Sequence, residues 1–213
     1  MKFTLEIPCN CGNTVISNAY GDGDFEDVQC PSCYATIHPV EPLSVSPVAE
    51  RLLLKSQAEL KGGDYSLAVV IAAMAVEAFL TRFFIKLKRM DNFAMSSNLA
   101  TPQEEEAWEK EYPRTGGFPK PADFVSTQIA GMPFDEFVVN NQTARAIMDG
   151  LADAPGISAK DYFTKELFYM RNRIAHWGYV NTTEEQGKRC HNFAVAIVSI
   201  FREMDKAKYF PNK

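Results

Sequence analysis

The chain has 213 residues, with 22 basic and 27 acidic side chains and a formal net charge of −5. Its 46% hydrophobic content, including 15 Phe, suffices for a packed core and excludes a globally disordered chain. A net acidic chain is not a general polyanion binder, so any contact with nucleic acid would have to be local.

The charge is unevenly distributed along the chain. Residues 1–42 carry one basic and six acidic residues and hold the whole net charge, whereas residues 43–213 carry 21 of each sign. The stretch 39–47 contains three prolines and is typical of a linker. We therefore expect two domains, at 1–42 and 43–213.

Four of the five cysteines lie in the first domain, as Cys9-Asn-Cys11-Gly12 and Cys30-Pro-Ser-Cys33. Short strands are expected at 3–7, 15–16 and 28, with a turn at 20–23. About 40 residues cannot bury enough apolar surface to fold alone, and four thiolates around Zn²⁺ would supply the missing stability. We predict a small β zinc ribbon with a structural zinc ion, and His38 is an alternative ligand. The ribbon's acidity argues against a nucleic-acid-binding role.

The sequence predicts a soluble cytoplasmic protein with no membrane association. Its start is charged early and lacks the apolar core of a signal peptide. The uncharged apolar run at 67–76 has ten residues, which we expect to be too short for a membrane span. In a reducing compartment, paired cysteines favour metal over disulfides.

Residues 43–213 show helical patterns only, and we predict an all-α bundle, so the fold class is mainly α with a small β ribbon in front. The bounds of the expected helices follow from their apolar periodicity and from the prolines and glycines that start and end helices. These are 47–61, 65 to about 90, 101–110, 133–151, 158 to about 178, and 182 to about 208. A loop is expected at 112–121, and the stretch 92–131 is a candidate lid or partner-specific insert.

The expected helix that starts at Tyr65 carries one notable acid. Its first half is apolar on every face, which is typical of a fully buried helix, and Glu77 is the only ionisable residue between Tyr65 and Thr81. A buried carboxylate needs a partner. We expect an arginine from a packed helix to pair with Glu77, with a structural ion pair as the simplest interpretation.

The expected helix at 158–178 offers that arginine. An apolar stripe runs along it at spacings of four, three, four and three residues: Phe163, Leu167, Met170, Ile174 and Trp177. Tyr169, Asn172 and His176 gather on the opposite face. Arg171 lies at the edge of the stripe, from which its long side chain can reach Glu77.

The segment Arg171-Asn172-Arg-Ile-Ala-His176 resembles the hallmark of HEPN domains, and residues 67–80 resemble that family's earlier long helix with its embedded acid. The resemblance covers roughly residues 47–210. It implies an all-α bundle that dimerises and, in many members, a metal-independent endoribonuclease of toxin–antitoxin or antiviral systems, with its site in the dimer cleft. His176 would then act as general base or acid, Arg171 would hold the scissile phosphate, Asn172 would orient either group, and Glu77 would position Arg171.

The sequence leaves alternatives open. Some of these toxins carry a modified Tyr two residues after the His, but here that position is Gly178, so regulation of that kind is in doubt. A homodimer, an RNA substrate and a possible antitoxin or regulatory protein are the expected partners. The main alternative is a non-catalytic HEPN-like module for dimerisation and binding of protein or nucleic acid; a zinc-ribbon transcription regulator is a third hypothesis. Cys190 and His191 open an apolar helix and are expected to have neither a metal-binding nor a nucleophilic role.

Overall fold

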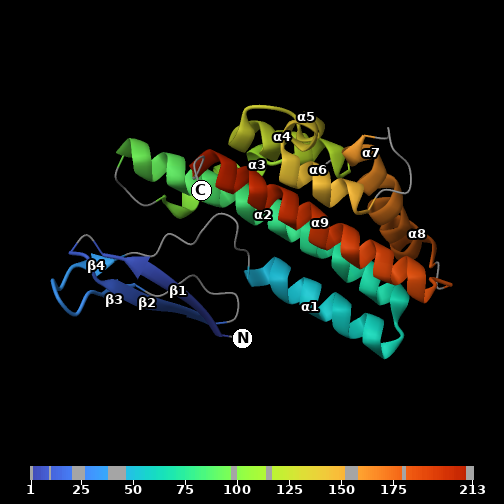
Figure 1. The fold of residues 1–213 in the computed structure, drawn as a ribbon, viewed down its shortest axis with the longest axis horizontal. Coiled ribbons are helices and arrows are strands. Elements are labelled where there is room, and N and C mark those ends of the chain that lie inside the picture. Colours follow the sequence, from blue (N-terminus) through green and yellow to red (C-terminus); the bar gives the residue numbers. More distant parts are fainter. Residues whose placement is uncertain are drawn as a thin grey trace.

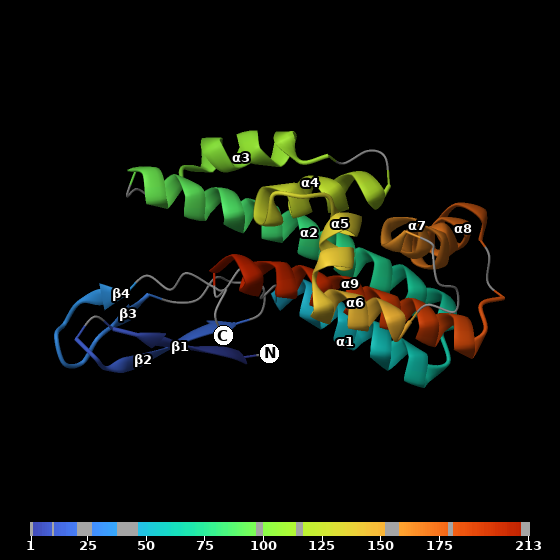
Figure 2. The same ribbon diagram turned by 45° about the horizontal axis from the view of Figure 1, so that its top comes forward.

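The computed structural model describes residues 2–9, 11–20, 27–37, 47–96, 100–113, 117–151, 158–178 and 181–209. Its N-terminal part is made of two antiparallel hairpins and the rest of helices, as Figure 1 shows. In both views the hairpins lie at one end of the molecule and the α7–α8 region lies at the other (Figures 1 and 2). The predicted domain boundary near residue 42, the turn at 20–23 and His38 fall outside the described residues.

The chain reverses direction at each pair of cysteines, so each pair lies between the two strands of one hairpin. Strand β1 (Lys2–Pro8) pairs with β2 (Thr14–Tyr20), from Lys2 opposite Tyr20 to Pro8 opposite Thr14. Strands β3 (Val28–Gln29) and β4 (Thr36–Ile37) form the second pair, of which β4 was not predicted. The buried centre of this part consists of Cys9, Val15 and Cys30, with Val28 and Ile37 packed against them.

Three long helices form the frame of the bundle, namely α1 (Pro47–Gly62), α2 (Tyr65–Ser96) and α9 (Glu184–Tyr209). Gly63 ends α1 at a φ of 83°, and the Asp64 carboxylate then accepts the Leu67 N–H at 3.0 Å as the cap of α2. Helix α9 packs on α1 and α2, and Gly187 permits this approach. A Cβ at Gly187 would lie 2.8 Å from Leu60 Cδ2.

Shorter helices cover the frame: α3 (Pro102–Glu111), α4 (Pro119–Ala130), α5 (Phe134–Asn140), α6 (Gln142–Asp149), α7 (Ala159–Phe163) and α8 (Tyr169–Trp177). A π-helical turn, η1 (Thr164–Phe168), joins α7 to α8. Helix α3 has the predicted Thr101 cap, with a reciprocal bond from Thr101 N–H to Glu104. Helix α4 starts inside the predicted loop at 112–121, and the predicted helix at 133–151 is two helices divided at Asn141.

The core lies where α2, α9 and the covering helices meet, and phenylalanine dominates it. Seven of its largest fully buried side chains are Phe79, Phe83, Phe84, Phe134, Phe163, Phe193 and Phe201. The segment 65–92 of α2 is long and apolar enough to cross a membrane, contrary to the estimate from its ten-residue uncharged run. However, 67% of its most apolar 18-residue window is buried inside the protein, which is the burial of a core helix.

Candidate functional site

The four N-terminal cysteines form one cluster, as predicted. The first knuckle, Cys9 to Asn13, is the turn between β1 and β2, and the second lies between β3 and β4. The Cys9 and Cys33 sulfurs are 3.5 Å apart, as are those of Cys11 and Cys30, and all four Sγ atoms lie within 4.8 Å of one another. Tetrahedral Zn–S bonds of 2.3 Å place sulfurs about 3.8 Å apart. The cluster can therefore hold a metal ion with four sulfur ligands.

The backbone and the neighbouring thiols determine how readily each cysteine of the cluster ionises. Gly12, at a φ of 92°, donates its N–H to the Cys9 carbonyl, and this closes the first turn. The pKa of Cys11 is lowered to about 6, first by the backbone N–H of Asn13 and then by the neighbouring thiols. The pKa of Cys9 is raised to about 12: the Cys11 N–H acts to lower it, but Cys33 and Cys11 raise it more together. Four adjacent sulfurs cannot all ionise alone, so a bound cation fits this set.

A second set of predicted residues meets where α8 packs on α2. An Arg171 Nη2–H donates to Glu77 Oε1 in the ion pair that the sequence predicted, and Arg171 Nη1 donates to Asn172 Oδ1 at 2.9 Å. Partial burial lowers the pKa of Arg171. Glu77 is not buried, however: its side chain is 48% exposed, against 24% for Arg171. Three of the four predicted catalytic residues thus form one connected chain of polar contacts.

The prediction that α2 is buried on every face is wrong. One face of this helix carries a stripe of exposed side chains, and Glu77 is exposed because it lies on that face. Leu67 and Met74 are 40% and 46% exposed, and they lie ten and three residues before Glu77. At 3.6 residues per turn these positions share one face of the helix. Exposed apolar side chains look the same as core residues in the sequence, which is why periodicity did not separate this face from the buried ones.

His176 lies on the exposed face of α8, as predicted, together with Tyr169 and Asn172. Arg173 lies over the Tyr169 ring, with its guanidinium carbon 5.8 Å from the ring centroid. Gly178 ends the helix at a φ of 62°, two residues after His176. His176 is therefore held at the solvent-facing end of a capped helix, on the same short element as Arg171.

The π-helical turn η1 sets the orientation of this element. The Tyr169 N–H bonds to the Thr164 carbonyl, five residues back, and the turn buries both Leu167 and Phe168. A π-turn inserts one residue into an α-helix and is frequent at functional sites. The predicted stripe holds in part, because Phe163 and Leu167 are buried while Met170 and Ile174 are partly buried. The Trp177 side chain is not among those that the structure describes.

A cavity of about 330 Å³ opens beside Glu77. Its lining comes from α2, the segments at 112–113 and 117–118, α4 and η1: Glu77, Leu80, Thr81, Tyr112, Pro113, Gly117, Phe118, Pro121 and Phe168. Thr81 Oγ1 donates to the Glu77 carbonyl at 2.9 Å. Burial raises the pKa of Tyr112 to about 12, so its hydroxyl stays protonated, and it interacts with Thr81. This cavity could not be predicted from the sequence, because its lining comes from segments that are far apart in the chain.

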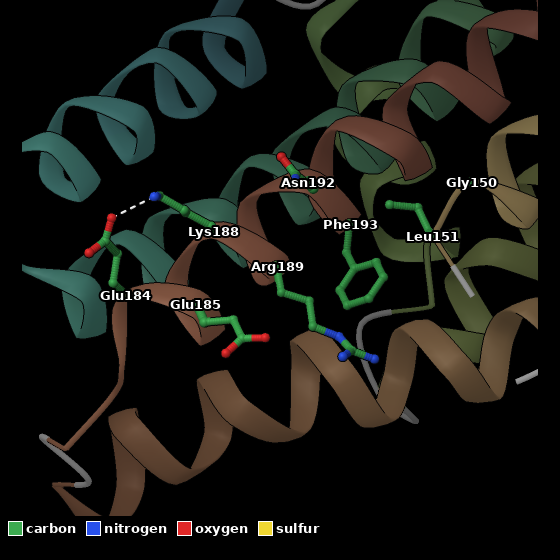
Figure 3. Close-up of a pocket in the computed structure, with 8 residues that line it drawn as sticks. All are labelled: Gly150, Leu151, Glu184, Glu185, Lys188, Arg189, Asn192 and Phe193. Atoms are coloured by element: carbon green, nitrogen blue, oxygen red, sulfur yellow. Dashed lines mark ion pairs between the residues drawn. The ribbon is translucent and has the colours of Figure 1, made fainter. Parts of the chain in front are cut away.

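A larger cavity of about 670 Å³ lies between the start of α9 and residues 150–151 (Figure 3). Its basic side chains have acidic partners: Lys188 pairs with Glu184 at 2.5 Å, and Arg189 lies 3.4 Å from Glu166. Arg189 also donates to the Tyr162 hydroxyl at 3.0 Å. In Figure 3 its side chain extends from α9 toward the facing helical segment. The Arg189 contacts tie α9 to the α7–η1 segment, while the Lys188–Glu184 pair lies within α9, so both basic side chains of this cavity already have partners.

Cys190 and His191, for which no metal or nucleophilic role was expected, make contacts that hold the helices together. Cys190 donates to the Glu166 carbonyl at 3.2 Å, and burial raises its pKa to about 12. His191 Nδ1 is 3.1 Å from Ser56 Oγ, which itself donates to the Ala68 carbonyl at 2.9 Å. Ser56 is fully buried and its proton is engaged, so this Ser–His pair is not a nucleophile and its base.

Comparison with known proteins finds no family model, no curated protein and no solved structure that matches the chain. The HEPN resemblance therefore rests on the residues of the chain alone.

Proposed function

We propose that the protein is a metal-independent endoribonuclease of HEPN type that acts as a toxin or antiviral effector. The observation that supports this most is the contact chain from Glu77 on α2 to Arg171 and Asn172 on α8, the short helix that also carries the exposed His176. The same short helix thus carries a cation that could bind a phosphate and an exposed imidazole that solvent and substrate can reach. A purely structural ion pair would need only Glu77 and Arg171. The presence of Asn172 and His176 together on the exposed face of the same helix favours phosphodiester chemistry instead.

In the proposed reaction an imidazole takes the proton of a ribose 2′-hydroxyl, whose oxygen attacks the adjacent phosphorus. The bond to the 5′-oxygen breaks, a second imidazolium protonates that oxygen, and the products are a 2′,3′-cyclic phosphate and a 5′-hydroxyl end. Arg171 binds the phosphate and stabilises its growing charge. Histidine suits both proton transfers, since its charge changes near neutral pH.

Two imidazoles require two protomers, because His176 is the one histidine on α8 and the other described histidine, His191, is held by Ser56 on a different helix. The exposed stripe of α2 offers a surface for such a homodimer, since Leu67 and Met74 lie on the face that carries Glu77. A cleft formed there would bring two copies of Arg171 and His176 together. A protein that covers this face would act as the antitoxin or regulator. Chemistry of this kind belongs in the cytoplasm, where RNA is present.

The cysteine cluster has a separate role in this proposal. Zn²⁺ is the ion that four thiolates of this spacing favour, and four protein ligands leave no open position for catalysis. Zinc would therefore hold the two hairpins together and take no part in RNA cleavage. In both views the cluster's hairpins lie at the end of the molecule away from α8 (Figures 1 and 2).

Incubation of the full chain with single-stranded RNA in excess EDTA tests the proposal. We expect cleavage products with cyclic phosphate ends, no cleavage of DNA, and a 10²- to 10⁴-fold loss in His176→Ala, roughly the contribution of general acid–base catalysis. Arg171→Ala should lose activity too, while Arg145→Ala, an exposed arginine on α6, serves as the matched control. Equal rates in all variants, or an inactive wild type, would refute the nuclease proposal.

The exposed apolar stripe favours one other candidate, a non-catalytic dimerisation and binding module. That module would show the same dimer and about one zinc per chain, but no RNA cleavage under any condition. Analytical ultracentrifugation, zinc analysis and the cleavage assay on one preparation separate the two candidates.

A further inference from the structure

The outer face of the η1–α8 segment carries a large aromatic side chain that the protein leaves uncovered. Tyr169 is 52% exposed, and its hydroxyl has no hydrogen-bond partner among the described residues. Arg173 lies one turn further on, over the Tyr169 ring, within the range of a cation–π contact. A single exposed tyrosine is common on protein surfaces. Here, however, a guanidinium supports the ring from one side while half of the side chain stays open to solvent.

This face is also basic. Lys165 precedes Tyr169 by four residues, about one turn, and is exposed. Within the part of the chain that the structure describes, its ammonium makes no ion pair and no hydrogen bond. Glu166 is the single acidic residue between positions 165 and 176, and it lies 3.4 Å from Arg189 on α9. An exposed ring flanked by basic side chains is typical of surfaces that bind single-stranded nucleic acid, where bases stack on the ring and cations contact phosphates.

Tyr169 shares this face with the proposed catalytic groups. Asn172 and His176 follow it at spacings of three and seven residues, and all three are exposed. Seven residues correspond to about 10 Å along the helix axis. A stacked strand advances about 3.4 Å per nucleotide, so a strand with a phosphate at His176 reaches Tyr169 within roughly three nucleotides.

We propose that Tyr169 is a base-stacking platform, which takes one unpaired base of the RNA strand whose phosphate Arg171 binds, while Lys165 contacts a neighbouring phosphate. The proposal rests on the proposed function for its substrate and adds the class of strand. Bases in a duplex stack on one another and do not reach the ring, so the substrate is single-stranded RNA and double-stranded RNA is excluded. Every base has a face that can stack, so the platform gives little sequence preference.

Binding of uncleavable oligonucleotides tests the platform independently of catalysis. The probes are a mixed-sequence 2′-O-methyl dodecamer, the same strand with abasic riboses, and the duplex of the dodecamer with its complement. Each is titrated against the full chain by isothermal titration calorimetry. Tyr169→Ala should weaken the single strand by roughly 5- to 150-fold, the equivalent of one stacked base, and leave the affinity for the abasic strand and the duplex unchanged.

Two variants control for the loss of the ring. Tyr169→Phe keeps an aromatic face and should bind the single strand as the wild type does. Tyr34→Ala removes a tyrosine that is 73% exposed in the N-terminal hairpins, and it should also keep wild-type affinity. Arg171→Ala and Lys165→Gln should weaken the base-bearing and the abasic strand by a similar factor, because both remove phosphate contacts.

Several results would overturn the platform: wild-type affinity in Tyr169→Ala or in Lys165→Gln, or duplex binding as tight as that of the single strand. A changed oligomeric state of Tyr169→Ala in analytical ultracentrifugation, with unchanged RNA affinity, would assign the ring to a protein contact and refute the platform too. Cleavage of single-stranded RNA is measured separately. Cleavage without ring-dependent binding leaves the nuclease proposal standing and refutes the platform, whereas ring-dependent binding without cleavage does the reverse.

Discussion

Replacing Glu77 with glutamine separates a positioning role from a structural one. The substitution keeps the shape of the side chain and removes its charge, so Arg171 loses an ion pair without a cavity being created. Because the two side chains are 48% and 24% exposed, the pair belongs with solvent-screened ion pairs, which contribute about 0.2–1 kcal/mol. A fully buried pair, which the sequence suggested, would cost about 3–5 kcal/mol when one partner is lost. Urea denaturation distinguishes these two ranges.

The same variant should have a larger effect on RNA cleavage. A small displacement of a positioned group can cost about 10²-fold in rate, so we expect Glu77→Gln to lose at least tenfold in activity while losing less than about 1 kcal/mol of stability. In an Arg171→Ala background the Glu77 change should have no further effect on cleavage. Glu106→Gln, which removes the exposed pair of Glu106 with Lys110 on α3, is the control and should keep full activity. A stability loss above 3 kcal/mol, or wild-type cleavage by Glu77→Gln, would refute this reasoning.

Three further predictions concern stability and the thiols. Burial lowers the pKa of His191, so just below pH 6.5 the unfolded state binds more protons than the folded state. The free energy of unfolding should therefore fall as the pH drops from 7 to 5. Urea titrations should show a shallower fall for His191→Gln than for the wild type. A strong chelator should release about one zinc per chain and expose four thiols to Ellman's reagent, while Cys190, with its pKa raised to about 12, should react only after denaturation. Asn141→Ala removes the cap that accepts the Ala144 N–H at 2.9 Å and should lower the unfolding free energy by about 0.5–2 kcal/mol, measured by urea denaturation.

Features set by neighbouring residues could be predicted from the sequence. The Thr101 cap, the end of α1 at Gly62-Gly63 and the end of α8 at Gly178 each depend on a few adjacent positions, and each lies where it was expected. The cysteine cluster was also predictable, because two closely spaced pairs of cysteines within 25 residues are typical of a metal site. The Glu77–Arg171 pair followed from one isolated acid and one helical stripe.

Features set by competition between local rules could not be predicted. Helix α4 begins at Pro119, within a segment rich in proline and glycine that is typical of a loop. Pro119 and Pro121 lie in its first turn, where the backbone N–H groups have no partner in the helix, so two prolines cost nothing there. At Asn141 the side chain caps α6 more favourably than a continuous helix would allow, and it divides the helix predicted over 133–151.

The π-turn η1 explains why the cavity and the arginine occur together. In an uninterrupted α-helix neighbouring residues point about 100° apart, and the single stripe predicted for 163–177 left no buried place for Phe168. The inserted residue lets both Leu167 and Phe168 face the protein, with Leu167 in the core and Phe168 on Phe118 at the cavity wall. Arg171 follows Phe168 by three residues, about one turn on, so whatever fixes Phe168 also fixes Arg171. A change at Phe168 should therefore also move the Arg171 contact with Glu77, which lies one turn of helix further on.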